Sequence, residues 1–368
     1  MEQRHYSLEE FAESKRSVST QKLSRRSLRQ YLLFVYPEAT LETADAYSLR
    51  YLKEGHDHFS HLVQYINQNR EKAPLTLNRV VSDVRYWLRW NGQELSVSES
   101  ARLKNILPRP VVITEDEALT IEKIRSILVH SDTLMRAFLL TLSSSGMRAD
   151  ELMGVRFSDM REEGGCRYFH IPAARMKARK PHDYRYSAEA YAAIQEWLKV
   201  RGEYVRKAEA KTRRCLGRDV DDTADLLFPL SYNTHSAKLH NALRDAKLLR
   251  QDETTKRYTI GFQAFRRWYD SVLKLHLPLN VANELVGHDE GLSSNYRRYP
   301  RKMLDDAYLS VEDHLRIFAP DDYVSLKGSM SEELKTQAST TAALAAELLR
   351  QREELDAMKL YIQATKKD

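Results

Sequence analysis

The sequence predicts a mainly helical protein that carries one small β-sheet. Apolar residues recur at helical spacing over most of the chain, and only two short stretches, near residues 167 and 184, are typical of strands. Prolines near residue 108 divide the chain into two parts. We therefore expect a helical domain over residues 1–105, a linker over 106–119, a mainly helical domain with the sheet over 120–325, and a C-terminal helix over 330–366.

The N-terminal part contains two amphipathic helices. Within residues 24–34, Leu28, Tyr31 and Leu32 lie on one helical face. A second helix follows Pro74, with Thr76 as its expected N-cap. Its apolar face comprises Val80, Val81, Val84, Trp87 and Leu88. The other positions of the two helices carry arginines that either contact an anionic partner or simply face solvent: Arg25, Arg26, Arg29, Arg79, Arg85 and Arg89.

The second part begins after an extended segment. Pro108 and Pro110 disfavour helix, and a helix is then expected from Thr120, a good N-cap before an apolar helical pattern. Gly164 and Gly165 separate a polar from an apolar stretch and precede an expected strand over residues 167–171. Residues 184–187 are expected to form the strand that pairs with it. Because the rest of this part has a helical pattern, the sheet is a minor feature.

The last forty residues have a different pattern. Apolar or small residues recur every seven positions, with charged residues between them: Leu334, Thr341, Leu348, Leu355 and Ile362. A seven-residue apolar repeat is typical of a coiled coil or a docking helix. The alternative is a helix that packs on the second domain of the same chain.

Composition excludes several classes of protein. The two cysteines, Cys166 and Cys215, can form neither a disulfide framework nor a four-thiolate zinc site. The N-terminus is polar, and no stretch approaches the roughly 20 apolar residues of a membrane span. We therefore expect a cytoplasmic protein, associated with the nucleoid if it is prokaryotic, and no membrane partner. The net charge of +6 is compatible with an anionic partner such as nucleic acid.

The strongest functional signal is an ordered set of phosphate-binding and nucleophilic residues. Arg148 lies in Ser-Gly-Met-Arg-Ala-Asp-Glu-Leu, Arg266 follows a Gly-Phe-Gln-Ala-Phe segment, and Gly287-His288 precedes Tyr296 by eight residues. An arginine fork matches two phosphate oxygens and keeps its charge at every physiological pH. A tyrosine hydroxyl needs such electrostatic help to attack a phosphodiester. No carboxylate cluster or HExxH pair indicates a metal-dependent nuclease.

This ordering resembles the tyrosine recombinase (phage integrase) family. The resemblance covers both ends of a segment of about 200 residues, and implies a C-shaped grip on duplex DNA by a core-binding domain and a catalytic domain. It implies that Arg148 and Arg266 hold the scissile phosphate, that His288 assists and that Tyr296 attacks, with Tyr299 as a rival. Lys177 is implied as the general acid, with Lys180 as the runner-up, and Arg175 and Lys180 as further DNA contacts. The spacing from His288 to Tyr296 looks closest to integrases of archaea and their mobile elements.

The chain departs from the family pattern at Gln263. A histidine usually stands three residues before the second arginine, whereas here it is glutamine. Glutamine can donate a hydrogen bond to phosphate but cannot exchange a proton as imidazole does. Any acid–base role at Gln263 is therefore in doubt.

The resemblance implies a site-specific recombinase that cleaves and rejoins double-stranded DNA through a covalent 3′-phosphotyrosyl intermediate, with no metal, ATP or other cofactor. Strand exchange then needs self-association, as a tetramer on paired sites. Two alternatives stay open. A type IB topoisomerase or telomere resolvase uses the same chemistry, and a non-catalytic DNA-binding protein can retain the scaffold.

Overall fold

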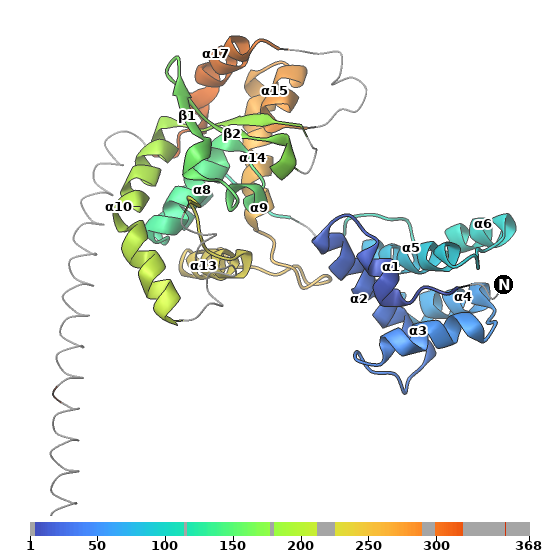
Figure 1. Cartoon of the computed structure of the whole chain (residues 1–368). Helices are drawn as coiled ribbons and strands as arrows, with labels where there is room; N and C mark the ends of the chain where they lie inside the picture. Colours follow the sequence, from blue (N-terminus) through green and yellow to red (C-terminus); the bar gives the residue numbers. More distant parts are fainter. Residues whose placement is uncertain are drawn as a thin grey trace, which may run out of the picture. The chain divides into compact units, whose positions relative to one another are not determined.

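A computed structural model describes residues 4–113, 116–176, 180–211, 225–288 and 299–318, together with Arg350. The described residues of Met1–Glu115 and Gln251–Arg257 form one compact unit. Those of Asp116–Arg250 and Tyr258–Asp368 form the other, which we call the C-terminal unit. Figure 1 shows the elements of each unit. The inclusion of Gln251–Arg257 in the N-terminal unit was not expected from the sequence.

The N-terminal unit is entirely helical in its described part. Its core is built from the apolar faces of the helices, with Tyr31, Tyr51, Tyr65 and Trp87 among the largest buried side chains. The Tyr31 and Tyr51 hydroxyls lie 2.9 Å apart inside this core. The helices are α1 (Leu8–Glu13), α2 (Val18–Val35), α3 (Ala44–Lys53), α4 (His58–Gln68), α5 (Pro74–Trp90) and α6 (Val97–Ile106).

One helix start predicted from the sequence was wrong. Helix α5 begins at Pro74 with Ala73 as its N-cap, so Thr76 lies inside the first turn. Proline is favoured at the first helical position, because the N–H that it lacks has no partner there in any helix. The expected apolar face is confirmed, since Val80, Val84 and Trp87 are buried.

Helix α8 (Thr133–Ser145) forms the centre of the C-terminal unit. Nearly all its residues are buried, and it packs against α10 (Ala188–Lys211) and α14 (Phe262–His276). The predicted start at Thr120 is confirmed: its hydroxyl caps α7 (Ile121–Val129). The remaining helices are α9 (Ala149–Leu152), α13 (Tyr232–Asp245), α15 (Leu279–Val286) and α17 (Arg301–Val311), with short 3-10 turns at Phe157–Asp159, Ala173–Arg175 and Glu312–Leu315.

A three-stranded antiparallel sheet has the order β1 (Met160–Glu163), β2 (Cys166–Ile171), β3 (His182–Arg185). The predicted strand over residues 167–171 is confirmed as β2, whereas the pairing strand begins two residues earlier than expected. Strand β1 was missed because its sequence, Met-Arg-Glu-Glu, is polar and mostly exposed. Glu163 pairs with Cys166 across the two-residue Gly164–Gly165 turn.

Helix α17 is held against the sheet and α8. Arg185 of β3, whose side chain is 2% exposed, forms an ion pair of 2.7 Å with Asp305. The Tyr308 hydroxyl donates to the carbonyl of Ser144 at 2.9 Å. The predicted C-terminal helix over residues 330–366 lies outside the described residues, apart from Arg350. Within the described part of the chain, no helix combines the length and apolar character needed to cross a membrane.

Replacing Asp305 with alanine is expected to destabilise the C-terminal unit strongly. The change leaves the buried Arg185 guanidinium without its carboxylate, and breaking one side of a buried ion pair costs about 3–5 kcal/mol. Urea unfolding followed by tryptophan fluorescence measures the loss. Asp306→Ala is the matched control, because the Asp306 side chain, next in the sequence, is exposed. Equal stabilities for the two variants would contradict a structural role for the pair.

Candidate active site

The first predicted arginine follows a sharp helix end. Helix α8 stops at Gly146, whose φ of 63° is left-handed. A Cβ added there would lie 2.2 Å from the ring of Tyr269, so a side chain is excluded by space as well as by backbone conformation. Arg148 then caps α9, where its backbone N–H and its Nη1 both donate to Glu151, at 3.2 and 3.0 Å.

Arg266 reaches the same turn from α14. Its side chain is buried, and Nη1 donates a hydrogen bond to the carbonyl oxygen of Gly146. Nη2 is also buried and makes no hydrogen bond of standard geometry among the described residues; the nearby Tyr184 hydroxyl, which interacts with the Arg266 guanidinium, donates its proton to Glu151. Burial, and after it the charge of Arg148, lower the pKa of Arg266. The structure therefore brings together two arginines that lie 118 positions apart, and one guanidinium nitrogen is left open for an oxyanion.

Glu151 and Tyr184 offset part of this positive charge. The Glu151 side chain is 6% exposed and accepts hydrogen bonds from Arg148 and, at 3.0 Å, from the Tyr184 hydroxyl. Burial, followed by the charge of Glu151, raises the pKa of Tyr184, so its hydroxyl keeps its proton. One carboxylate thus orients Arg148 and is itself held by β3.

His288 is presented by a second left-handed glycine. Gly287 ends α15 with φ of 73°, and the backbone N–H of His288 donates to Asn283 at 3.0 Å. His182 of β3 supports this turn: its Nε2 lies 3.3 Å from the Leu285 carbonyl oxygen. Burial and the nearby Arg266 lower the pKa of His288, opposed by Asp270 at 4.0 Å. The imidazole is therefore neutral at physiological pH and can accept or donate a hydrogen bond.

Not all predicted site residues can be placed. Gln263 is exposed on α14, one turn before Arg266 and on the same side of the helix. Lys180 is exposed at the end of the β2–β3 connection. Lys177 and Tyr296 lie outside the described residues, so their roles stay predictions. Tyr299 is described, and its hydroxyl accepts a hydrogen bond from Asn280 at 2.6 Å.

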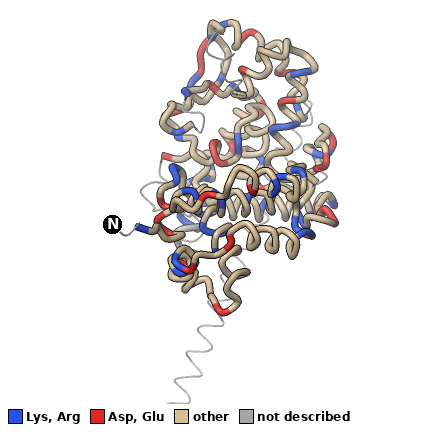
Figure 2. Tube along the Cα trace, turned by 90° about the vertical axis from the view of Figure 1, so that its right-hand side faces the viewer, with Lys and Arg blue, Asp and Glu red and all other residues tan. Residues whose placement is uncertain are grey.

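The structure separates the predicted DNA-binding arginines by their partners. Arg25 and Arg29 both pair with Glu9, and Arg79 pairs with Asp83 at 2.9 Å. Arg26 is exposed. These pairings reduce the positive charge available to DNA on α2 and α5. Figure 2 shows the same mixture more widely, with acidic and basic residues interspersed along the helices.

Arg175 is better explained as a structural residue. Its guanidinium forms a two-pronged ion pair with Asp159, whose side chain is 6% exposed, and also donates to the Gly154 carbonyl at 3.1 Å. A guanidinium engaged in this way has little capacity left for phosphate. We therefore leave Arg175 out of the proposed DNA-binding surface.

Three residues around the site were not anticipated from the sequence. Tyr184 and His182 lie on a short strand whose start was misplaced, and Tyr269 packs its ring on Gly146. The one available signal was the alternation of polar and aromatic residues from His182 to Tyr186, which is typical of a strand. The resulting arrangement of two arginines, a neutral histidine and an orienting carboxylate is suited to binding one phosphate group and stabilising charge on it.

A mainly helical unit that brings arginines together in this way is suited to an enzyme that acts on phosphodiesters. The sequence model of the phage integrase family matches residues 112–302, just over half of the chain. The chain therefore belongs to the phage integrase family, and it is a tyrosine site-specific recombinase that acts on DNA.

The chain is similar in fold to one solved recombinase structure and matches a second less well. XerH site-specific recombinase bound to a palindromic difH substrate is 16% identical with a TM-score of 0.50, covering 79% of each chain. A lambda integrase dimer bound to a COC′ core site is 13% identical with a TM-score of 0.46, covering 75% of this chain and 97% of that one. No curated protein sequence matches this chain.

Replacing Gly146 with alanine is expected to lower the free energy of unfolding by at least about 2 kcal/mol. A left-handed backbone costs a residue with a side chain about 1–2 kcal/mol, and the Tyr269 ring must also move. Gly202→Ala is the control, because Gly202 lies in α10 with open space around it. Urea unfolding of both variants measures the difference. A Gly146→Ala protein as stable as the Gly202→Ala protein would show that the contact with Tyr269 is unimportant.

Proposed function

We propose that this recombinase holds the scissile phosphate with Arg148, Arg266 and His288 and attacks it with Tyr296. The observation that carries the proposal is the buried Nη2 of Arg266, which makes no hydrogen bond of standard geometry in the described part of the chain and lies beside a second arginine. A buried donor without a partner costs free energy, and a phosphate oxygen would satisfy it. Charge-assisted hydrogen bonds of this kind are the strong ones.

The proposed reaction conserves the energy of the phosphodiester. The Tyr296 oxygen forms a bond to phosphorus while the bond to the 5′ oxygen breaks, giving a 3′-phosphotyrosyl link. Lys177 gives its proton to the leaving 5′ oxygen, with Lys180 as the alternative donor. Attack of a 5′ hydroxyl on the link reverses these steps, so religation needs no ATP. In the proposed site, the guanidinium groups of Arg148 and Arg266 stabilise the charge on the phosphate during both steps.

His288 and Gln263 are proposed to complete the phosphate site. A neutral His288 can donate one hydrogen bond to a non-bridging oxygen and can accept the phenolic proton as Tyr296 attacks. Gln263 is exposed in the first turn of α14, where the free N–H groups of the helix also favour an anion. Its amide can therefore donate to the phosphate without any proton transfer.

The remaining proposals concern assembly and place. We propose that residues 1–105 act as the DNA clamp, that 120–325 form the catalytic domain, and that four protomers assemble on paired sites. The helix expected over residues 330–366 is proposed to mediate the contact between protomers. A recombinase works where its DNA lies, so we place the protein in the cytoplasm, at the nucleoid if it is prokaryotic.

Tyr296→Phe is expected to abolish covalent adducts while DNA binding stays close to wild type, because only the nucleophilic hydroxyl is removed. Duplexes from the DNA that flanks the gene, incubated with protein and separated under denaturing conditions, reveal the adduct. Tyr299→Phe is the matched control and should still form it. Adducts that persist in Tyr296→Phe and vanish in Tyr299→Phe would assign the nucleophile to Tyr299. If both variants still form the covalent adduct, neither tyrosine is the nucleophile.

Arg266→Lys is expected to slow cleavage by on the order of 10²–10³, the cost of losing one preorganised donor at a developing charge. Lysine keeps the charge but has a single nitrogen, whereas arginine donates to Gly146 from Nη1 and keeps Nη2 for the phosphate. Single-turnover adduct formation measures the rate, and a gel shift measures binding. Arg267→Lys is the control, because Arg267, the next residue on α14, is exposed and pairs with Asp116. Equal rates for the two variants would remove Arg266 from the phosphate site.

A further inference from the structure

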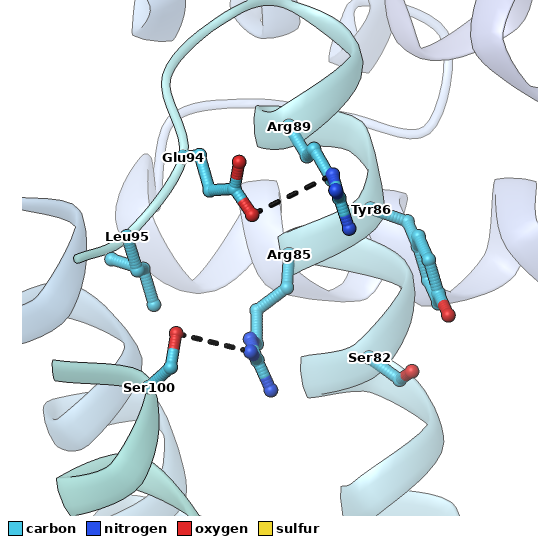
Figure 3. Close-up of a pocket in the computed structure, with 7 residues that line it drawn as sticks. All are labelled: Ser82, Arg85, Tyr86, Arg89, Glu94, Leu95 and Ser100. Atoms are coloured by element: carbon cyan, nitrogen blue, oxygen red, sulfur yellow. Dashed lines mark hydrogen bonds and ion pairs between the residues drawn. The ribbon is translucent and has the colours of Figure 1, made fainter. Parts of the chain in front are cut away.

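A small polar pocket lies between α5 and α6 in the N-terminal unit, and the proposed function does not explain it. It has a volume of about 150 Å³. Four residues of α5 line it, and the remaining wall comes from the α5–α6 connection and α6. Figure 3 shows Arg85 and Arg89 extending from α5 toward this wall. The polar lining residues are Ser82, Arg85, Tyr86, Arg89, Glu94 and Ser100.

Arg85 is the charged group at the centre of the pocket. It is half-buried, and its Nη2 donates to the Ser100 hydroxyl at 3.1 Å. In contrast to Arg25, Arg29 and Arg79, it forms no ion pair with any carboxylate of the described residues. Its positive charge is therefore oriented by a neutral group and left for an external anion.

Glu94 stands opposite Arg89 at the edge of the pocket. The two side chains lie 3.5 Å apart and are 59% and 66% exposed, respectively. An exposed pair at this distance is weak and is easily exchanged for another anion. Glu94 is the only acidic residue of the pocket lining, so it is the one group there that repels an incoming anion.

We propose that this pocket, defined by Arg85, Arg89, Ser82, Tyr86 and Ser100, binds one backbone phosphate of duplex DNA, and that Glu94 competes with that phosphate for Arg89. The proposal rests on the proposed function, because a recombinase must hold duplex DNA. It adds a defined phosphate site and an internal competitor that weakens binding to DNA of any sequence.

The chemistry of the lining favours a phosphate over a base edge. Two guanidinium groups and three hydroxyls can all donate hydrogen bonds, and a phosphate offers acceptors only. A base edge in the major groove presents donors beside acceptors, which this set matches poorly. The pocket volume is several times the roughly 30 Å³ of a water molecule in the liquid, so a protruding phosphate group fits.

The test measures binding of the full-length chain to a fluorescent duplex of arbitrary sequence over a range of salt concentrations. Each phosphate contact contributes about −0.9 to the slope of log K against log salt. Arg85→Gln should weaken binding and make the slope shallower by about 0.9. Arg85→Lys keeps the charge and should retain most of the slope while losing affinity. Glu94→Gln should tighten binding about two- to fivefold, as expected for removal of an exposed ion pair.

Glu42→Gln is the matched control for Glu94→Gln. Glu42 is an exposed residue of the same unit outside the pocket lining, and the substitution changes the net charge equally. If Glu94→Gln and Glu42→Gln tighten DNA binding equally, the effect is due to net charge, and the proposed competition between Glu94 and the phosphate is overturned. A wild-type slope for a folded Arg85→Gln protein, checked by circular dichroism, would overturn the phosphate site. Because this binding needs no cleavage, failure of the Tyr296 adduct assay would reject the proposed function and leave the pocket result standing.

Discussion

The hydrogen bond from Arg266 to the carbonyl of Gly146 is the contact on which the proposed phosphate site depends. The last four carbonyl groups of a helix have no partner within that helix, and its C-terminus carries partial negative charge. At the end of α8, Arg266 of α14 and Tyr308 of α17 satisfy two of them, at Gly146 and Ser144. The end of α8 therefore contacts both α14 and α17. In the sequence, α14 lies before α15 and the proposed nucleophile segment, and α17 lies after them. The end of α8 also directs the chain into Arg148.

This arrangement has an electrostatic cost. Arg148 and Arg266 carry like charges, and burial of Arg266 removes the water that would screen them. Glu151 compensates part of that charge, and Tyr184 holds Glu151 in place. The open nitrogen of Arg266 shows that compensation is incomplete among the described residues. A site held in this state binds a phosphate more strongly than a fully neutralised one, because the missing partner is supplied by the substrate.

Local patterns in the sequence predicted local features well. The N-cap at Thr120 and strand β2 follow from side chains and periodicity within a few residues, and both are confirmed. Strand β1 escaped prediction because an exposed edge strand needs no apolar alternation. The start of α5 was misplaced because two good signals, Pro74 and Thr76, lie two residues apart and only one can begin the helix.

The order of Arg148, Arg266 and Gly287-His288 ahead of Tyr296 was enough to predict the class of chemistry, because this order resembles that of the phage integrase family. Gly146 and Gly287 were also readable, since Gly146 lies two residues before Arg148 and Gly287 directly precedes His288. Only the tertiary structure decided which arginines are available. Arg25, Arg29, Arg79 and Arg175 look alike in the sequence, yet each meets a carboxylate, whereas Arg85 meets a hydroxyl. Charge pairing depends on distances of a few ångströms between side chains, several of them contributed by separate elements, and no local pattern encodes those distances.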